Sequence, residues 1–219
     1  MTEKLDGVRA YYDPTLGLLI SRIGTVYPAP PFFFEGFPKH TALDGELYIQ
    51  RQKLAETLEI VKDGEHEGWN RIRYKVFDAP AVPDIYEQRL VVLSQVLSQA
   101  TFADIVHGEI CRGKEHVYES LKAIEALGGE GIMLRKPKSL YIGKRSATLL
   151  KVKSFYDAEA RVQLVVAGKG KFTGMMGALQ CTMASGAIIK IGTGFSDKDR
   201  LNPPQVGSVV TYRFIQILT

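Results

Sequence analysis

Apolar and polar residues alternate in the first half of the chain in the way that is typical of β-strands. The apolar positions recur every second residue over short runs that end at glycine, proline or charged residues. The pattern predicts strands over residues 8–12 (VRAYY), 17–22 (GLLISR), 42–49 (ALDGELYI) and 71–80 (RIRYKVFDAP). In the last of these, one face carries Ile72, Tyr74 and Val76, and the other face is charged apart from Phe77.

Two later segments have apolar residues at helical spacing. Pro83 and Asp84 mark the start of the first, whose apolar positions are Tyr86, Leu90, Leu93 and Leu97. The second runs through Val117, Leu121 and Ile124 and ends at Gly128 and Gly129. The apolar run that follows, EGIMLRK (130–136), predicts a buried strand.

From about Ala158 the chain consists of short apolar runs separated by glycine-containing turns. The pattern predicts strands over 160–168, 177–184, 187–192 and 208–214, with a brief helical turn at SDKDR (196–200). Such spacing is typical of a small β-barrel. The change of pattern at SFYDAEA (154–160) indicates two domains, 1–155 and 156–219.

Composition narrows the class of protein. With 45% hydrophobic and 24% charged residues, the chain has enough apolar content for a folded core, which excludes a disordered protein. No run approaches the ~20 apolar residues of a membrane span, and the N-terminus has no signal segment. We therefore expect a cytoplasmic protein with no membrane partner, unless a leader for export was removed. Cys111 and Cys181 have no CxxC spacing, so we expect buried thiols and no disulfide or zinc site.

Positive charge is concentrated in one segment. Residues 135–171 contain ten Lys or Arg and only two acidic residues, Asp157 and Glu159, so this segment carries +8 of a chain whose net charge is +4. Such asymmetry is expected where a face binds a polyanion, although a solvated charged loop would have the same composition.

The candidate chemistry is carried by short polar motifs. KLDGVR (4–9) places a lysine, a carboxylate, a glycine and an arginine in one turn, which suits phosphate chemistry but also an ordinary surface turn. In LDGELY, Asp44 and Glu46 share a strand face that is suited to a metal or a ribose, or simply to water. Lys151 and Lys153 share a face in LLKVK, where an anionic partner would relieve their repulsion.

Taken in order, KLDGVR, SRIG, LDGELY, YKVFDAP, EGIMLRKP and LLKVK closely resemble the motifs of ATP-dependent DNA ligases over residues 4–153. The segments GKGKFTGMMGALQC and IKIGTGFSDKDR are similar to the OB-fold domain of small bacterial and viral members. The resemblance implies an α+β fold, in which an ATP-grasp-like nucleotidyltransferase domain with mixed and antiparallel sheets precedes a small β-barrel OB domain. The OB domain is expected to be truncated at its C-terminus.

The resemblance also implies a role for each matching residue. Lys4 is the nucleophile that takes AMP from ATP, and Phe77 stacks on adenine. The residues implied in nucleotide binding are Thr2, Glu3, Arg9, Arg22, Glu46, Phe77, Lys151 and Lys153. Those implied in binding the nick or DNA are Arg9, Arg22, Arg145, Lys169 and Lys171. The residues implied in placing Mg²⁺ or Mn²⁺ are Glu46 and Glu130.

The resemblance implies a monomer that binds nicked duplex DNA and seals it through a lysyl-AMP intermediate. Two other classes of enzyme share the Lys-x-Asp-Gly motif, namely RNA ligases and mRNA capping guanylyltransferases. The GTGFSDKDR segment favours a DNA ligase over both. A catalytically impaired nucleic-acid-binding fragment is the alternative from a different class.

Overall fold

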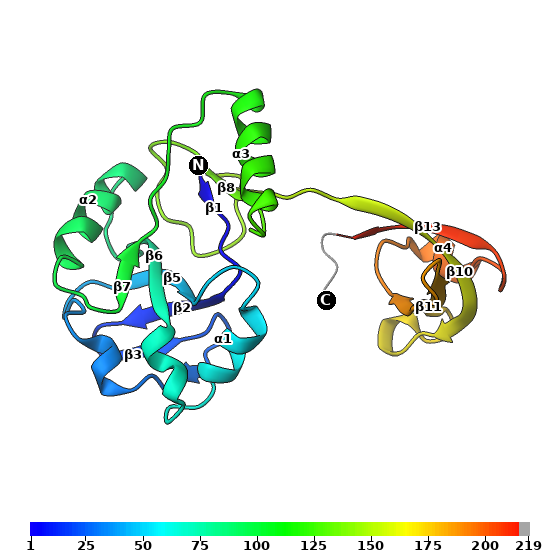
Figure 1. Cartoon of the computed structure of the whole chain (residues 1–219), viewed down its shortest axis with the longest axis horizontal. Helices are drawn as coiled ribbons and strands as arrows, with labels where there is room; N and C mark the ends of the chain where they lie inside the picture. Colours follow the sequence, from blue (N-terminus) through cyan, green and yellow to red (C-terminus); the bar gives the residue numbers. More distant parts are fainter. Residues whose placement is uncertain (215–219) are drawn as a thin grey trace. The chain divides into compact units, whose positions relative to one another are not determined.

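The computed structural model describes residues 1–214 and divides the chain into two compact units, Met1–Lys153 and Ser154–Thr219. The first contains two β-sheets and most of the helices, and the second is mainly β (Figure 1). This is the mixed α and β composition that the hydrophobic pattern predicts. Within residues 1–214, every helix is too short or too polar to cross a membrane.

A six-stranded sheet forms the centre of the first unit. Its neighbours pair antiparallel except at one edge, where β6 and β7 are parallel. In spatial order the strands are β4 (Val26–Tyr27), β3 (Leu18–Ile20), β2 (Val8–Asp13), β5 (Leu43–Tyr48), β6 (Arg73–Asp78) and β7 (Ala103–Ile105). The strands predicted from the alternating pattern are therefore confirmed.

The alternation in these strands fixes which side chains reach the core. Tyr74 and Val76 are fully buried, whereas Lys75 and Phe77 lie on the other face, as predicted. On that outer face Arg9 lies directly opposite Glu46, because β2 and β5 pair in that register, and Glu46 lies opposite Lys75 on β6. Three central strands thus present a row of charges outside the core.

Helices and an aromatic cluster cover the core face of this sheet. The cluster includes Phe33, Phe37, Trp69 and Tyr74, whose rings pack edge-on, tilted or stacked. The helical elements of the unit are η1 (Pro31–Phe34), α1 (Leu54–Ile60), η2 (Glu67–Arg71), α2 (Tyr86–Val96) and α3 (Lys114–Ala126), of which α3 packs against the other sheet. Helix α2 packs against β6, and α1 packs against β2 and β5 (Figure 1). The sequence pattern predicted α2 and α3 but missed α1.

A separate three-stranded antiparallel sheet contains the N-terminus. Its order is β1 (Thr2–Glu3), β8 (Ile132–Arg135) and β9 (Leu149–Val152), and α3 packs against β8 (Figure 1). EGIMLRK is therefore a strand, but only Ile132 of β8 is fully buried, so the prediction of a buried strand is only partly right. Lys4 continues the pairing of β1, since its backbone N–H donates to the Gly131 carbonyl at 2.8 Å.

The second unit is a four-stranded antiparallel sheet with a small core. Its order is β12 (Ile188–Ile191), β11 (Met176–Met183), β10 (Tyr156–Ala167) and β13 (Val209–Phe214). Val162, Leu179 and Cys181 are completely buried between its strands. A turn, η3 (Gly170–Phe172), joins β10 to β11, and α4 (Asp197–Leu201) confirms the predicted helical turn. Cys111 is exposed, so the expectation of a buried thiol is wrong there.

Candidate active site

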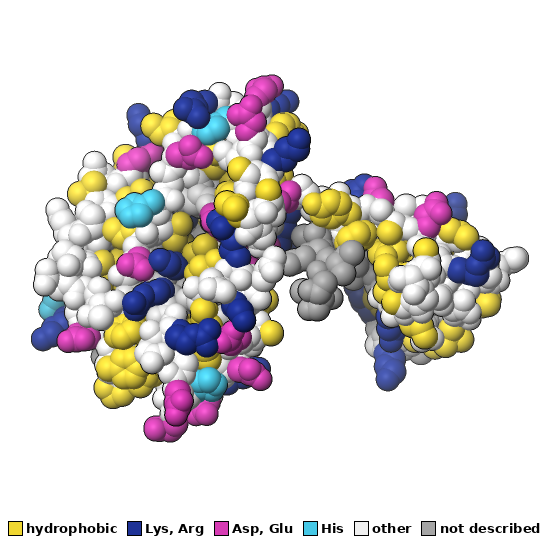
Figure 2. Space-filling model, viewed as in Figure 1, with side chains coloured by type: hydrophobic (Ala, Val, Ile, Leu, Met, Phe, Trp, Pro, Cys, Tyr) yellow, Lys and Arg dark blue, Asp and Glu magenta, His cyan; other side chains and the backbone are white. Residues whose placement is uncertain are grey.

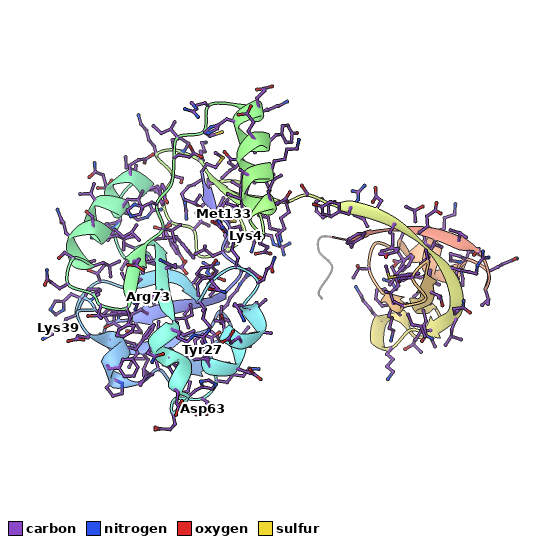
Figure 3. All side chains as sticks on the ribbon, viewed as in Figure 1. Lys4, Tyr27, Lys39, Asp63, Arg73 and Met133 are labelled. Carbon is purple, nitrogen blue, oxygen red and sulfur yellow. The ribbon has the colours of Figure 1, made fainter. Side chains whose placement is uncertain are left out.

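Lys4 lies at the edge of the three-stranded sheet, where it forms an ion pair with Glu130. The other carboxylate oxygen of Glu130 binds the ammonium of Lys153, just past the end of β9. The side chains of Lys4, Glu130 and Lys153 are 24%, 14% and 11% exposed, so this Lys4–Glu130–Lys153 triad is largely shielded from solvent. Figure 3 labels Lys4 close to Met133 of β8, which pairs with Thr2.

Burial makes Lys4 easier to deprotonate. Loss of solvent around its ammonium lowers the pKa of Lys4, and the carboxylates of Glu46 and Asp6 oppose that change. Burial, followed by the nearby charge of Lys4, also lowers the pKa of Lys153. Two cations that share one carboxylate destabilise each other, which favours loss of a proton from one of them.

The glycine of KLDGVR permits a close approach of the turn after Lys4 to β5. A Cβ on Gly7 would lie 2.4 Å from the carbonyl oxygen of Leu47 and 2.8 Å from Cγ of Glu46. The Gly7 backbone also hydrogen-bonds to the Glu46 carboxylate. The glycine therefore allows the turn after Lys4 to pack directly on β5, and it brings Glu46 towards Lys4.

Glu46 has a strongly perturbed carboxyl group. Burial raises the pKa of Glu46 to about 7, although Lys4 and Arg9 act to lower it. A carboxyl group whose pKa lies near 7, in a cluster of cationic side chains, is common in sites that bind charged ligands. The expectation that Asp44 and Glu46 share a face agrees with this arrangement, because both influence Arg9.

Arg9 is held in place by Asp44 and lies against Phe77. Its guanidinium binds Asp44 through two nitrogens, Nε at 3.0 Å and Nη2 at 2.6 Å, and its Cζ is 5.6 Å from the centre of the Phe77 ring. The Tyr141 hydroxyl also donates to Asp44, at 2.8 Å. Tyr141 therefore ties the segment after β8 to the six-stranded sheet beside Phe77.

A second cluster, whose Asp78 and Arg89 are fully buried, begins one residue after Phe77. Asp78 accepts from Arg89 Nε at 2.5 Å and Nη2 at 3.2 Å, and from Arg135 Nη2 at 3.0 Å. Both arginines lie near the ring of Tyr86, with Cζ–centroid distances of 5.7 Å for Arg89 and 4.4 Å for Arg135. Because Arg135 ends β8 and Asp78 ends β6, the cluster fixes the two sheets of the unit to each other.

Sequence comparison places both units in known families. Residues 2–153 match the model of the ATP dependent DNA ligase domain, and residues 167–218 match the DNA ligase OB-like domain. The chain belongs to the ATP-dependent DNA ligase family. It is 38% identical over 216 residues to a DNA ligase of Haemophilus influenzae, a match that covers 98% of this chain and 79% of that protein.

Solved structures of ligases agree with this membership. A Lig E DNA ligase, studied for DNA binding with a minimal scaffold, superposes with a TM-score of 0.92 and is 38% identical, covering 98% of this chain and 84% of that one. Chlorella virus DNA ligase-adenylate has a TM-score of 0.59 at 23% identity, covering 99% and 85% of the two chains, which shows a shared fold. The predicted fold class, a ligase nucleotidyltransferase domain followed by an OB-like domain, is confirmed.

The structure gathers some of the ligase-motif residues and leaves others apart. Lys4, Glu130 and Lys153 touch, and Arg9, Glu46 and Phe77 lie on the outer face of the central sheet. Thr2 and Glu3 form β1, where Glu3 binds Arg51 at 2.8 Å. The predicted site residues with exposed side chains outside these contacts are Arg22, Arg145, Lys151, Lys169 and Lys171.

The sequence reasoning missed several residues that shape this ligase site. They are Asp6, Tyr27, Asp78, Arg89, Arg135 and Tyr141. One signal was available, because Arg89 lies three residues after Tyr86 and four before Leu93, on the apolar stripe of α2. A charged residue on such a stripe requires a buried partner.

Two carboxylates around Lys4 fit the divalent cation of the family. Glu130 touches Lys4, and the charge of Glu46 acts on Lys4. Within residues 1–214, no three His, Cys, Asp or Glu side chains come together to hold a metal. Mg²⁺ commonly binds one or two carboxylates and completes its shell with water and substrate phosphates, so this donor set fits it.

Proposed function

We propose that this chain seals nicks in duplex DNA through AMP carried on Lys4. The Lys4 amine attacks the α-phosphorus of ATP, a P–N bond forms, and pyrophosphate leaves as the bond to it breaks. AMP then passes to the 5′-phosphate at the nick, and the adjacent 3′-hydroxyl displaces it to form the phosphodiester bond. The observation that carries this proposal is the half-buried Lys4, with its lowered pKa, between the carboxylates of Glu130 and Glu46.

Nucleotide binding is proposed for the outer face of the central sheet. Phe77 offers its ring for stacking on adenine, and Glu46 accepts hydrogen bonds from the ribose. Arg9 lies between the ring and Asp44, so its guanidinium is already aligned for a phosphate or a ribose oxygen. Thr2 and Glu3 of β1 directly precede Lys4 and are proposed as further nucleotide contacts.

Charge neutralisation is proposed for the surrounding cations and a metal ion. Lys153 touches Glu130 and is close enough to Lys4 to stabilise the α-phosphate, with Lys151 two residues before it in the chain. Mg²⁺ or Mn²⁺ bound through Glu130 and Glu46 would neutralise charge on the phosphates. Arg22 and Arg145 extend from exposed turns as contacts for the 5′-phosphate of the nick.

DNA binding is proposed to depend on backbone phosphates. Figure 2 shows basic side chains over the middle of the visible face of Met1–Lys153, and Figure 3, from the same side, labels Lys4 and Arg73 on that face. In the second unit, Lys169 and Lys171 are exposed around the η3 turn. Because such contacts release counterions, nick affinity is expected to fall as salt rises, with a monomer bound to each nick.

Intact-mass measurement after incubation with nucleotide and Mg²⁺ tests the chemistry. ATP is expected to add one AMP to the wild-type chain, and the Lys4→Ala variant is expected to gain nothing. Lys39→Ala is the matched control, since Lys39 is an exposed lysine outside the site (Figure 3), and it should load like the wild type. Loading of Lys4→Ala would exclude Lys4 as the nucleophile.

The same samples separate the alternatives. A gain of GMP from GTP would indicate a capping enzyme, and sealing of nicked RNA in preference to nicked DNA would indicate an RNA ligase. Failure both to load AMP and to seal a preadenylated DNA nick, with nick binding retained, would indicate a binding module without catalysis.

A further inference from the structure

Arg200 in α4 is a buried arginine that joins three segments of the second unit. Its residue is 5% exposed. Nη1 donates to the carbonyl oxygens of Met176 at 3.0 Å and Gly177 at 2.9 Å, and Nη2 donates to that of Gly192 at 3.1 Å. The guanidinium therefore connects the start of β11 to the residue that follows β12.

The same guanidinium lies against two phenylalanine rings. Its Cζ is 4.0 Å from the centre of the Phe172 ring and 5.5 Å from that of Phe195. Phe172 is the last residue of the η3 turn, and the ammonium of the preceding residue, Lys171, lies 4.7 Å from the centre of the same ring. Arg200 thus sets the position of a ring that also contacts Lys171.

The partners of Arg200 are all neutral. Among residues 1–214 it takes part in no ion pair, and its contacts are carbonyl oxygens and rings. A buried cation without a carboxylate is costly compared with an apolar side chain of the same size. Stability alone therefore does not explain why an arginine is found here. The planar guanidinium, whose donors bind several segments at once, does explain it.

Backbone hydrogen bonds close the η3 turn on itself, from Gly168 N–H to the Met175 carbonyl at 2.8 Å and from Met175 N–H to the Phe172 carbonyl at 3.0 Å, and Arg200 joins this closed turn to α4 through the Phe172 ring. Gly168 packs so tightly that a Cβ would lie 2.2 Å from the Phe172 carbonyl oxygen, while Gly170 has a positive φ of 60° and open space around it. Lys169 and Lys171 on this turn are exposed, whereas Phe172, the next residue along the chain, is half-buried against Arg200. The direction of both lysines therefore follows the position of Phe172.

We propose that Arg200 is a positioning residue for DNA binding, which holds the Lys169–Phe172 turn so that Lys169 and Lys171 reach phosphates together. This inference rests on the proposed nick binding by the two lysines. Arg200 itself stays buried and contacts no DNA. Loss of its fork leaves both lysines present but scatters their ammonium groups, which lowers the number of phosphates neutralised at once.

A double-mutant cycle measured as nick affinity against salt tests this proposal in the full chain. Lys169→Ala combined with Lys171→Ala is expected to reduce the slope of log affinity against log salt by about 2, which is about 1 per phosphate contact. Arg200→Met alone is expected to reduce the same slope by about 1 to 2. In the chain that already carries both alanines, it is expected to cause no further reduction. Additive losses would overturn the proposal.

Two further variants separate positioning from charge and from general destabilisation. Arg200→Lys keeps the charge but not the fork, so it is expected to behave like Arg200→Met; a wild-type slope in Arg200→Lys would overturn the proposal. Phe172→Leu keeps an apolar residue but removes the ring, and it is expected to show the same coupling with the two lysines, even if Arg200→Met fails to fold. Additive behaviour in Phe172→Leu would overturn it too.

A matched control and the wild type complete the design. The control is Arg213→Met. Arg213 is exposed, its Cζ lies 5.7 Å from the centre of the Phe155 ring, and its charge is paired with Asp157. The substitution is expected to leave the salt slope unchanged. If the two alanines leave the slope unchanged, the proposed lysine contacts and this inference both fail. If the alanines act as expected but the variants of Arg200 do not couple to them, only this inference fails.

Discussion

Asp78→Asn is a substitution for which the structure predicts a large loss of stability. Asp78 is fully buried and is the carboxylate partner of two arginines, Arg89 with no exposure and Arg135 with a side chain 12% exposed. Asparagine keeps the size of the side chain but removes its charge. Two guanidinium groups then remain in the interior with no carboxylate in contact, and asparagine also presents an N–H₂ group where an arginine donates.

The expected magnitude follows from the cost of an uncompensated buried charge. Removing one partner of a buried ion pair costs about 3–5 kcal/mol, and here one removal leaves two charges. That is a large part of the ~5–15 kcal/mol by which a domain is stable. For a unit of this size, a loss of 1 kcal/mol lowers the midpoint temperature of thermal unfolding by about 2–4 °C. We therefore expect this midpoint to fall by about 6–20 °C in Asp78→Asn.

Tryptophan fluorescence measures this effect in the correct unit. The chain has one tryptophan, Trp69, which is 1% exposed in the core of Met1–Lys153, so its emission follows the unfolding of that unit. Asp104→Asn is the matched control, because Asp104 binds Lys75 at 2.9 Å on the surface with its side chain 53% exposed. An exposed pair contributes about 0–1 kcal/mol. Equal midpoints for the two variants would refute the reasoning.

Two further predictions concern Glu46 and Gly7. Burial raises the pKa of Glu46 from 4.5 to about 7, so between these pH values the folded state keeps a proton that the unfolded state loses. The free energy of unfolding therefore falls as the pH rises from about 4.5 to 7, by up to ~3 kcal/mol. Urea unfolding at pH 5 and pH 8 is expected to show this fall in the wild type and a smaller one in Glu46→Gln; identical pH dependence would contradict it. Gly7→Ala is expected to slow AMP loading at least tenfold, because the added Cβ would lie 2.4 Å from the Leu47 carbonyl oxygen. Gly143→Ala is the control and should load normally, since the atom nearest to its added Cβ is 3.7 Å away. Equal loading rates for the two variants would argue against the close approach of Gly7 to β5.

Local patterns in the sequence predicted the strands and the faces of the central sheet. Alternation in β6 placed Tyr74 and Val76 inside and Phe77 outside, because side chains of a strand point to opposite faces whatever the strand pairs with. The same reasoning placed Asp44 and Glu46 together. Helix α1 was missed because its seven residues, LAETLEI, contain too few turns for an apolar stripe to stand out.

Contacts between distant segments could not be predicted from such patterns. Glu130 is 126 residues from Lys4 along the chain, and Tyr141 is 97 residues from Asp44. Each contact depends on how the two sheets pack, which periodicity in one strand does not encode. The ligase resemblance identified Glu130 through its motif, but Tyr141 and Asp78 have no signal of their own and emerge only from the packed structure.

KLDGVR has a geometric role beyond carrying Lys4, the proposed nucleophile. β1 belongs to the three-stranded sheet and β2 to the six-stranded sheet, so the turn from Lys4 to Gly7 is the direct covalent link between them. A link this short fixes Lys4 relative to Glu46 only if the sheets cannot rotate about it, and the Asp78–Arg135 pair supplies a second connection at the other ends of β6 and β8. Together with the Tyr141–Asp44 hydrogen bond, these connections define the orientation of one sheet on the other, whereas one alone would leave a hinge. The position of Lys4, the proposed nucleophile, therefore depends in part on an ion pair that lies outside the Lys4–Glu130–Lys153 triad.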